Sequence, residues 1–279
     1  MNLRRPAALV AQDLDERLGR DHRGGLLTDT IEEQAAVREL LDSAQAVLFD
    51  FDGPVCDLFG DESTSPVAKK IRRMAKGVWR ELDPQVEFCD DSHGVLRCLR
   101  DMYDRRPHGE LDPSPLAEAE RIVAEFECEV VLEARTAPHF VTLVRLLLEL
   151  PRRLAIVSNN AERPIRMYLR KLDLEGEFEV FGRDPENAGH MKPDPHCVER
   201  ALDHLGIEPS HCLLVGDQIT DLKAAQSVGT PFLGYTQDEV RRVEMRKYGA
   251  HSVVLSHLPV VAAARGLITI SRGSGPAAP

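Results

Sequence analysis

Short apolar runs that each end in polar residues recur along the chain and set its predicted architecture. The first, Ala46–Phe49, is followed by Asp50-Phe51-Asp52-Gly53, and the others are Leu154–Val157, Cys212–Val215 and Pro231–Gly234. A continuous apolar run of this length is typical of a strand that is buried on both faces of a sheet. Because helical patterns separate the runs, we expect an α/β fold with a doubly wound, Rossmann-like parallel sheet, whose ligands lie beyond the carboxyl ends of the strands.

The chain between the first predicted strand and Leu154 is much longer than a single crossover helix needs. It holds roughly 100 residues, whereas a crossover takes about a dozen or more. Helical patterns fill it, and the first begins at Ser65-Pro66, a favourable N-cap and N1 pair. Its apolar positions have helical spacing: Val67, Ile71, Met74, Ala75, Val78 and Leu82. We therefore predict an inserted α-helical cap over the strand ends, hinged near Leu58–Gly60 and Thr136–Pro138.

These patterns divide the chain into a core, an insert and two flanking segments. The core takes residues 45–59 and 136–270, including an apolar helix over His139–Leu150, and the helical cap takes residues 60–135. Residues 1–44 form an N-terminal extension, weakly ordered over residues 1–28 and helical from the capping-box spacing at Thr30–Glu33 to about Ala44. Residues 271–279, rich in Gly, Ser, Pro and Ala, are expected to form a disordered tail.

Composition narrows the classes of partner. The 279 residues include 35 basic and 46 acidic side chains, and the net charge of -11 argues against general affinity for nucleic acid. No stretch approaches the roughly 20 apolar residues needed to cross a membrane, and acidic residues interrupt the N-terminus before a secretory core could form. The six cysteines form no Cys-x-x-Cys pair and are expected to be reduced thiols of a cytoplasmic protein. Nothing in the pattern predicts an oligomeric state.

Asp50 and Asp52 stand two residues apart where the first strand ends, so the strand period of two can point both carboxyl groups toward the expected site. One carboxylate can attack phosphorus, while the other, protonated, can donate to the departing oxygen and later take a proton from water. Repulsion between the two acids helps to keep one of them protonated. The alternative is that the Asp-x-Asp-Gly turn only ends the strand, because Asp and Gly are favoured in turns.

A second acidic pair, Asp217 and Asp221, follows the Cys212–Val215 run. Mg²⁺ prefers hard oxygen ligands and usually takes only one or two carboxylates from a protein. We expect Asp217 to be the direct metal ligand, and Asp221, one helical turn further on, to orient a metal-bound water. The alternative is that Asp217 caps the helix that follows.

Ser158, Asn159 and Lys192 are the candidate contacts for a phosphoryl group. Ser158 and Asn159 end the Leu154–Val157 run, where a hydroxyl and free N–H groups can hold phosphate oxygens. Lys192 stands in Met191-Lys192-Pro193-Asp194-Pro195, whose prolines restrict the backbone and can fix the direction of the lysine side chain. Taken singly, Ser158 is more typical of a cap, and a lone lysine is more typical of a solvated surface.

The order of these residues along the chain resembles the four motifs of the haloacid dehalogenase-like (HAD) hydrolase superfamily, in particular its phosphatases with an inserted helical cap (subfamily I). The matching segments are Asp50-Phe51-Asp52-Gly53, Ser158, Lys192-Pro193 and Gly216-Asp217-x-x-x-Asp221. The resemblance covers about residues 45–256. It implies that Asp50 is the nucleophile and a metal ligand, and that Asp217 is a metal ligand. It implies that Asp52 is the acid/base and a metal ligand through its backbone carbonyl, and that Ser158 and Lys192 contact phosphate.

The function implied by the resemblance is that of a Mg²⁺-dependent phosphohydrolase, which acts on a small phosphorylated metabolite through an aspartyl-phosphate. Asp52 favours a phosphate ester, because dehalogenases similar to this family generally lack that carboxylate and phosphonate-cleaving relatives usually have a small residue there. Two alternatives stay open: a phosphosugar mutase of the same fold, and a phosphate-sensing or regulatory protein without turnover. Pro54 departs from the family pattern, in which threonine or another small or branched residue is usual, and it removes one N–H donor from the turn.

A basic stripe follows the polar side of the first insert helix. It consists of Lys69, Arg72, Arg73, Lys76 and Arg80. Such a stripe could meet a polyanionic substrate, but a solvated helix face is the more common role. The histidines His108, His139 and His190 are assigned no role.

Overall fold

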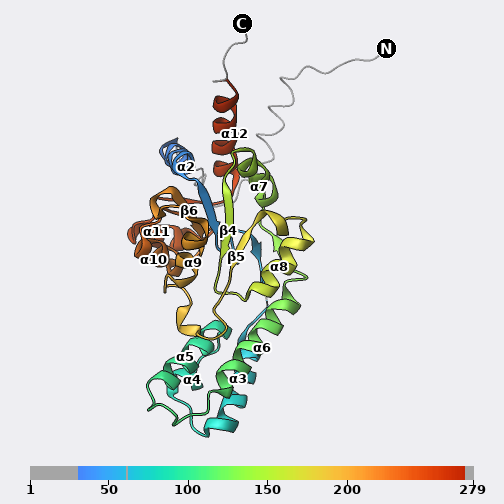
Figure 1. Ribbon diagram of the computed structural model, residues 1–279, viewed down its shortest axis with the longest axis vertical. Coiled ribbons are helices and arrows are strands. Elements are labelled where there is room, and N and C mark those ends of the chain that lie inside the picture. The colour runs from blue at the N-terminus through green and yellow to red at the C-terminus, as the bar shows by residue number, and fades with distance from the viewer. Residues whose placement is uncertain (1–30, 61, 274–279) are drawn as a thin grey trace, which may run out of the picture.

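A six-stranded parallel sheet, in the order β5-β4-β1-β6-β7-β8, forms the centre of the described part of the chain. The computed structural model describes residues 31–60 and 62–273. The strands are β1 (Ala46–Phe49), β4 (Arg153–Val157), β5 (Glu179–Phe181), β6 (Cys212–Gly216), β7 (Phe232–Tyr235) and β8 (Ser252–Val254). In β1, Phe49 is level with Ile156 of β4 and Val215 of β6 (Figure 1). The predicted parallel sheet is confirmed, and its three central strands end at one edge.

Helices cover both faces of the sheet, which explains why its strands are unbroken apolar runs. Phe49 and Ile156 belong to one core layer, and Leu48 and Val157 belong to the other. The first layer includes α2 (Ile31–Ser43), α7 (Phe140–Glu149), α8 (Glu162–Lys171) and α12 (Leu258–Gly273). The second includes α9 (His196–Leu205), α10 (Ile219–Val228) and α11 (Glu239–Lys247), which Figure 1 shows on the side of the strands opposite α7 and α8. The predicted doubly wound fold is therefore confirmed.

The insert forms a helical layer with a core of its own. Its helices are α3 (Ser65–Trp79), α4 (Pro84–Glu87), α5 (Ser92–Asp104) and α6 (Ser114–Val130), which Figure 1 shows beyond one end of the sheet. Ile71, Leu99 and Val123, from three different helices, are fully buried among them. The prediction of a parallel-sheet core with an inserted α-helical cap is confirmed, whereas motion of the insert as a lid stays a prediction.

The first insert helix, α3, differs in detail from its prediction. Thr64 is the N-cap, and Ser65 is already helical. The buried stripe passes from Ala75 to Trp79, since residues four apart lie on the same helix face. Val78, one of the apolar positions with helical spacing, is 44 % exposed, although it lies two turns beyond the buried Ile71 on the same helix face.

Part of the basic stripe on α3 is neutralised inside the insert. Arg72 Nη1 donates to Asp90 Oδ1 at 2.9 Å, and Lys76 Nζ donates to Glu87 Oε1 at 2.8 Å. Neither basic side chain lines the cavity at the strand ends. These contacts favour the interpretation of the stripe as an ordinary polar helix face.

A short two-stranded ribbon joins the insert to the core. β2 (Cys56–Asp57) pairs antiparallel with β3 (Arg135–Thr136), so the two connections of the insert run side by side. The sequence did not predict these strands, because two residues carry no periodic pattern. The hinge predicted near Leu58–Gly60 and Thr136–Pro138 adjoins this ribbon and stays a prediction.

Some elements lie outside the predicted pattern. β5 and β8, of three residues each, form the two edges of the sheet. α12 continues to Gly273, so residues 271–273 are helical and do not belong to a disordered tail, while residues 274–279 lie outside the described residues. The predicted extension helix is present as α2, whereas the capping box at Thr30 and residues 1–28 lie outside the described residues. No described helix has the length and apolar character needed to span a membrane.

Candidate active site

The predicted site residues converge on one cavity at the carboxyl ends of β1, β4 and β6. The cavity has a volume of about 290 Å³. The predicted residues that line it are Asp50, Asp52, Ser158, Asn159, Lys192, Asp217 and Asp221. The insert and its connection contribute Phe59, Thr64, Asp91 and His93. Strands that are distant in sequence but adjacent in the sheet therefore bring most of the predicted side chains together, and Lys192 and Asp221 reach the same place from the loop before α9 and from α10.

Lys192 is the cation at the centre of this group. Its ammonium Nζ donates to Asp50 Oδ1 at 2.8 Å and to the carbonyl oxygen of Val157 at 2.9 Å, and it lies 2.6 Å from Asp221 Oδ1. The side chain is only 1 % exposed. Burial alone would lower the pKa of Lys192, but the carboxylates of Asp221 and Asp50 raise it above its ordinary value, so the amine stays charged. The alternative of a solvated lysine is therefore wrong.

The backbone of Lys192 is fixed by two neighbouring side chains. The amide of Asn159 accepts a hydrogen bond from Lys192 N at 2.7 Å and donates one to Lys192 O at 3.3 Å. Arg97 of α5 donates to the same carbonyl oxygen at 2.7 Å, and the Lys192-Pro193 peptide bond is cis. Asn159 thus holds the lysine in place, a role that sequence reasoning missed when it placed this side chain among the phosphate contacts.

Asp217 carries the feature that most directly indicates a cation. Its carboxylate and those of Asp50 and Asp221 each offer an oxygen within 4.8 Å of the others. Asp217 Oδ1 is buried and accepts no hydrogen bond from the described residues. Burial, followed by the charges of Asp50 and Asp221, raises the pKa of Asp217 to about 8. The other oxygen of Asp217, Oδ2, lies 3.2 Å from Arg241 Nη1. Three clustered carboxylates beside Lys192 and Arg241 form a hard-oxygen donor set that fits Mg²⁺.

Asp221 is held by the protein at both carboxylate oxygens. Oδ2 accepts from Gln218 N at 2.9 Å, and Oδ1 faces Lys192. Burial, and then the charge of Asp221, raises the pKa of Asp50 to about 6, while Lys192 lowers it. Gln218 is the N-cap of α10, so the alternative that Asp217 caps this helix is wrong. The water-orienting role of Asp221 stays a prediction.

Asp52 lies on the same cavity as Asp50, in agreement with the two-residue period. Its Oδ1 accepts from Leu58 N at 2.9 Å, which fixes the side chain within the turn after β1. Burial raises the pKa of Asp52, so this carboxyl group keeps its proton to a higher pH than an exposed aspartate does. Gly53 has a φ of +103°, and a Cβ there would lie 2.7 Å from Asp217 Cγ, so only glycine suits this position.

Pro54, the departure from the family pattern, is held by a histidine far along the chain. His257 Nε2 donates to the carbonyl oxygen of Pro54 at 2.6 Å. The imidazole is fully buried and stacks on Tyr235, with 4.6 Å between ring centres. Burial lowers the pKa of His257 to about 4, so the ring is neutral near pH 7. His257 thus supports a turn in which Pro54 has no backbone N–H to donate. The sequence did not indicate this role of His257.

Ser158 lies on the cavity and also organises the turn after β4. Its hydroxyl accepts from Asn160 N at 3.2 Å and donates to Asn160 Oδ1 at 3.1 Å. Its backbone N–H donates to the carbonyl oxygen of Phe181 at 3.1 Å. The N-cap of α8 is Ala161, so Ser158 orders the turn before this helix and does not cap it, and its fixed hydroxyl faces the cavity in which a phosphate contact was predicted.

A buried ion pair joins the insert to the core beside the site. The side chains of Glu127 (α6) and Arg183, which follows β5, are both 0 % exposed, and Arg183 Nη1 donates to Glu127 Oε1 at 2.9 Å. Glu127 also accepts from Asn160 Nδ2 at 3.0 Å and from Ala161 N at 2.9 Å. His93, which lines the cavity, lies 2.8 Å from Glu127 Oε1. Burial would raise the pKa of Glu127, but Arg183 and His93 lower it to about 2.

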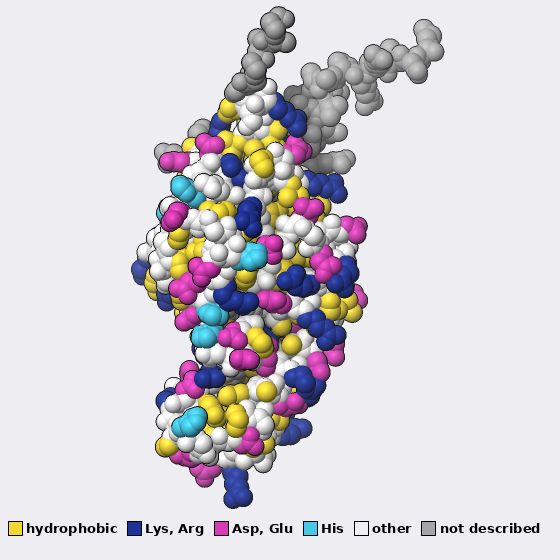
Figure 2. All heavy atoms as spheres, in the orientation of Figure 1, with side chains coloured by type: hydrophobic (Ala, Val, Ile, Leu, Met, Phe, Trp, Pro, Cys, Tyr) yellow, Lys and Arg dark blue, Asp and Glu magenta, His cyan; other side chains and the backbone are white. Residues whose placement is uncertain are grey.

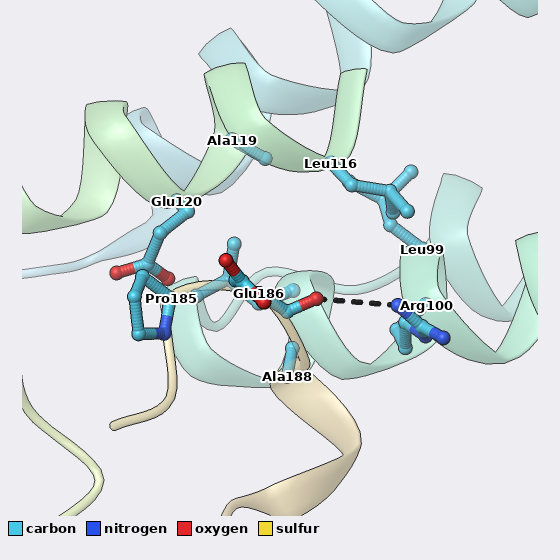
Figure 3. Close-up of a pocket in the computed structure, with 9 residues that line it drawn as sticks. Leu99, Arg100, Leu116, Ala119, Glu120, Pro185, Glu186 and Ala188 are labelled. Atoms are coloured by element: carbon cyan, nitrogen blue, oxygen red, sulfur yellow. Dashed lines mark hydrogen bonds between the residues drawn. The ribbon is translucent and has the colours of Figure 1, made fainter. Parts of the chain in front are cut away.

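A small cavity marks a second contact between insert and core (Figure 3). It has a volume of about 20 Å³, room for roughly one water molecule, and lies where α5 and α6 meet residues 185–188. Arg100 Nη1 donates to the carbonyl oxygen of Glu186 at 3.2 Å. None of the predicted site residues lines it, so it is a packing gap at the junction and not part of the active site.

Breaking the buried pair is expected to destabilise the protein far more than breaking a surface pair. Glu127→Ala leaves Arg183 buried with Glu120 as its remaining carboxylate partner, and loss of one partner from a buried pair costs about 3–5 kcal/mol. Glu125→Ala is the matched control on the same helix, because Glu125 pairs with Arg121 at the surface and exposed pairs contribute about 0.2–1 kcal/mol. Urea denaturation at pH 7 measures both free energies of unfolding.

The contribution of Glu127 should also depend on pH. Its pKa is about 2 in the folded protein and 4.5 ordinarily, so its stabilisation is present above pH 4.5 and is lost as the pH falls toward 2. The gap between wild type and Glu127→Ala should narrow over that range. Equal destabilisation by the Glu127 and Glu125 variants at pH 7 would contradict this account of the junction.

Comparison with known proteins identifies the family of this chain. Residues 44–229 match the model of the haloacid dehalogenase-like hydrolases. The phosphoglycolate phosphatase of Rhodospirillum rubrum is 31 % identical over 134 residues, which are 46 % of this chain and 55 % of the relative. The phosphoglycolate phosphatase of Rhodobacter capsulatus is 28 % identical over 197 residues, which are 70 % of this chain and 85 % of the relative. The chain thus spans about half the length of the first relative and most of the second.

A solved structure shows the same fold. The crystal structure of a predicted phosphoglycolate phosphatase from Haemophilus somnus matches with a TM-score of 0.55 and 17 % sequence identity, over 79 % of this chain and 97 % of that one. At this identity the likeness concerns the fold alone. The match to the family model is a match of sequence, and its range, residues 44–229, includes Asp50, Ser158, Lys192 and Asp217. This chain belongs to the haloacid dehalogenase-like hydrolase family.

Proposed function

We propose that this chain is a Mg²⁺-dependent phosphatase that acts on a small phosphorylated metabolite through phosphorylation of Asp50. The observation that carries the proposal is the buried group of Asp50, Lys192 and Asp217. A carboxylate is fixed by an ammonium at 2.8 Å, next to a carboxylate oxygen that lacks a partner among the described residues. A carboxylate in such a place is a competent nucleophile toward phosphorus. The relatives from Rhodospirillum rubrum and Rhodobacter capsulatus, both named phosphatases, support the same reaction class.

In the proposed first step, Asp50 attacks the phosphorus atom, so that a carboxylate oxygen bonds to phosphorus and the bond to the leaving oxygen breaks. Asp52 donates its proton to that leaving oxygen, and its raised pKa favours this role. Lys192 and Ser158 hold the phosphoryl oxygens, where negative charge accumulates. A Mg²⁺ ion held by Asp50, Asp217 and the backbone carbonyl of Asp52 would neutralise part of that charge.

In the proposed second step, water attacks the phosphorus of the aspartyl-phosphate. Asp52, now ionised, takes a proton from that water, the bond between Asp50 and phosphorus breaks, and orthophosphate leaves. The insert, residues 60–135, would have to exclude water during the first transfer and admit it for the second. We therefore propose that it acts as a lid that moves on the β2–β3 ribbon.

The proposed substrate is a small phosphate monoester, with phosphoglycolate as the first candidate. A cavity of about 290 Å³ is near the lower end of ligand-pocket volumes and suits a small metabolite. The two relatives are named for phosphoglycolate. The six cysteines are free thiols, and we propose a cytoplasmic location.

Orthophosphate release across a panel of phosphoglycolate, phosphosugars and nucleotides, with Mg²⁺ present, tests the function. We expect release from at least one small monoester. Conversion of a phosphosugar to its isomer without net orthophosphate release would replace the phosphatase with a mutase. Binding of phosphate compounds without turnover of any of them would replace it with a sensing role.

The apparent affinity for Mg²⁺ should rise with pH. The cation binds ionised carboxylates, whereas Asp217 without metal has a pKa of about 8. Below that pH a proton must leave before the cation binds, so the affinity should fall roughly tenfold for each pH unit. Calorimetric Mg²⁺ titrations of chelator-treated protein at pH 6, 7 and 8 measure this dependence.

Two variants accompany the metal titrations. Asp217→Asn should lose both Mg²⁺ binding and turnover, whereas Asp203→Asn, an exposed change on α9, should keep both. Full activity of thoroughly demetallated wild-type protein would remove the metal from the mechanism. An affinity that does not change between pH 6 and pH 8 would contradict the role of Asp217 as the ionising ligand.

A further inference from the structure

Three potential metal ligands meet outside the active-site cavity, in the segment between β5 and α9. Asp184, His190 and His196 each offer a ligand atom within 4.8 Å of the other two. The imidazole rings of His190 and His196 stack with 4.2 Å between their centres, and His190 Nδ1 lies 2.7 Å from Asp184 Oδ2. All three side chains are half-buried. Figure 2 shows histidine side chains side by side on the surface, where Figure 1 places the chain that leads into α9.

We propose that Asp184, His190 and His196 form a binding site for a borderline divalent transition metal ion such as Zn²⁺. Two imidazoles and one carboxylate are ligands that Zn²⁺ takes in proteins, whereas Mg²⁺ prefers oxygen ligands only. The site therefore differs in chemistry from the all-carboxylate group around Asp217. It would bind a different ion, and the proposal stands independently of the phosphatase reaction.

The present contacts of the three side chains resemble a site held together by hydrogen bonds in place of a metal. Ligand atoms of a tetrahedral Zn²⁺ site lie roughly 3.3 Å apart when the bonds are about 2.0–2.1 Å long. The 2.7 Å distance between His190 Nδ1 and Asp184 Oδ2 would have to lengthen. The other two distances between ligand atoms, each at most 4.8 Å, would have to reach the same value of roughly 3.3 Å. Movements of this size lie within the freedom of half-buried side chains. With three protein ligands, a fourth position stays open to water.

The local hydrogen bonds already orient the ligands, as outer contacts do in metal sites. Asn187 Nδ2 donates to His190 Nε2 at 2.9 Å, so the ring proton lies on Nδ1, which points toward Asp184 at 2.7 Å; Zn²⁺ bound through Nδ1 would take the place of this proton. Asp194 Oδ1 accepts from His196 N at 3.0 Å and so fixes the start of α9. The ligands are therefore presented by a segment whose conformation is determined before any ion binds.

The position of this site links it to the catalytic lysine. Lys192 lies between His190 and His196 in the sequence, and its Nζ reaches Asp50 at 2.8 Å. An ion bound by both histidines would tie together the two ends of the short segment that presents Lys192. We expect this cross-link to raise the thermal unfolding temperature when the ion binds.

Zn²⁺ binding is best measured by calorimetry on the full chain, with excess Mg²⁺ present to occupy the active-site carboxylates. We expect one Zn²⁺ per chain, a higher unfolding temperature, and at least tenfold weaker binding in His190→Asn and His196→Ala. His204→Ala is the matched control, because His204 is an exposed histidine of the same helix, α9. It should bind Zn²⁺ as the wild type does. Unfolding curves recorded with a chelator show whether each variant remains folded.

Two further variants separate this site from other metal-binding groups. Asp217→Asn should keep the Zn²⁺ site, and so should Cys89→Ser, which removes a thiol of the insert. Substituted Co²⁺ should give the visible spectrum of nitrogen and oxygen ligands without a thiolate band. The proposal is overturned if wild type binds no Zn²⁺, if His196→Ala binds it as tightly as His204→Ala, or if Asp217→Asn or Cys89→Ser abolishes binding.

Discussion

Asp50→Asn should remove detectable turnover while leaving the fold intact. An amide cannot attack phosphorus, and loss of a catalytic nucleophile costs on the order of 10⁴–10⁶ in rate. The side chain keeps nearly the same shape, and its oxygen can still accept from Lys192 Nζ, which donates to Asp50 Oδ1 at 2.8 Å. Orthophosphate release measures the activity, and circular dichroism with urea denaturation measures the fold.

Asp203→Asn, on the exposed side of α9, is the control for the change in charge and should behave as wild type. A stronger test uses the phospho-enzyme itself. Wild type quenched in acid during turnover should carry phosphate on Asp50, and Asp50→Asn should carry none. Wild-type rates of phosphate release by Asp50→Asn, or phosphate found on another residue, would remove Asp50 from its proposed role.

The central strands could be predicted because burial on both faces imposes a readable pattern. Ala46–Phe49 and Cys212–Gly216 lie in the middle of the sheet, so every residue in them is buried. The edge strands could not be predicted in the same way. Glu179–Phe181 and Ser252–Val254 are only three residues long, too short for a periodic signal, and they exist because neighbouring strands offer free backbone groups.

The site was predictable to the extent that strand ends position it. Asp50, Ser158 and Asp217 each follow a strand of the same parallel sheet, so topology alone brings them together. Lys192 stands on a segment without regular structure, and its backbone is fixed by contacts with Asn159 and Arg97 that no sequence spacing reveals. The motif order identified the lysine, but only the structure shows what holds it.

Support for the site comes from residues far away in the sequence, and these were missed. His257 donates to Pro54 across 203 positions of chain, and no local pattern connects the two. Glu127 left a weak signal: it falls on the buried face of α6 with Ile122 and Val123, where an unpaired carboxylate would be costly. A glutamate on an apolar helix face therefore indicates a buried partner, and the structure identifies Arg183 as that partner.

Asp52→Asn should slow the first phosphoryl transfer much more for an alkyl phosphate than for an aryl phosphate. The leaving oxygen of a sugar or glycolate is a poor leaving group without a proton, whereas para-nitrophenolate is already stable as an anion. General acid catalysis supplies about 10²–10⁴-fold, so we expect a loss of that order for the alkyl substrate and a much smaller loss for para-nitrophenyl phosphate. The raised pKa of Asp52, which burial causes, is consistent with a carboxyl group that holds a proton to donate.

The same variant should stop after the first step with the aryl substrate. Asp52 is also the proposed base for the attacking water, so without it the aspartyl-phosphate on Asp50 should accumulate. Rapid-mixing measurements should then show a burst of nitrophenol, followed by slow turnover, with a burst size close to one per active chain. Acid-quenched samples should contain phosphate on Asp50 in an amount that matches the burst.

The burst distinguishes acid/base catalysis from a purely positional role. Asp52 Oδ1 accepts a hydrogen bond from Leu58 N at 2.9 Å, and asparagine can accept the same bond through its own oxygen, so the turn should keep its shape. If Asp52 only positioned the metal or the backbone, both substrates would slow by the same factor, because neither the leaving group nor the water would depend on its proton. Equal slowing, without a burst and without trapped phospho-enzyme, would therefore withdraw Asp52 as the acid/base.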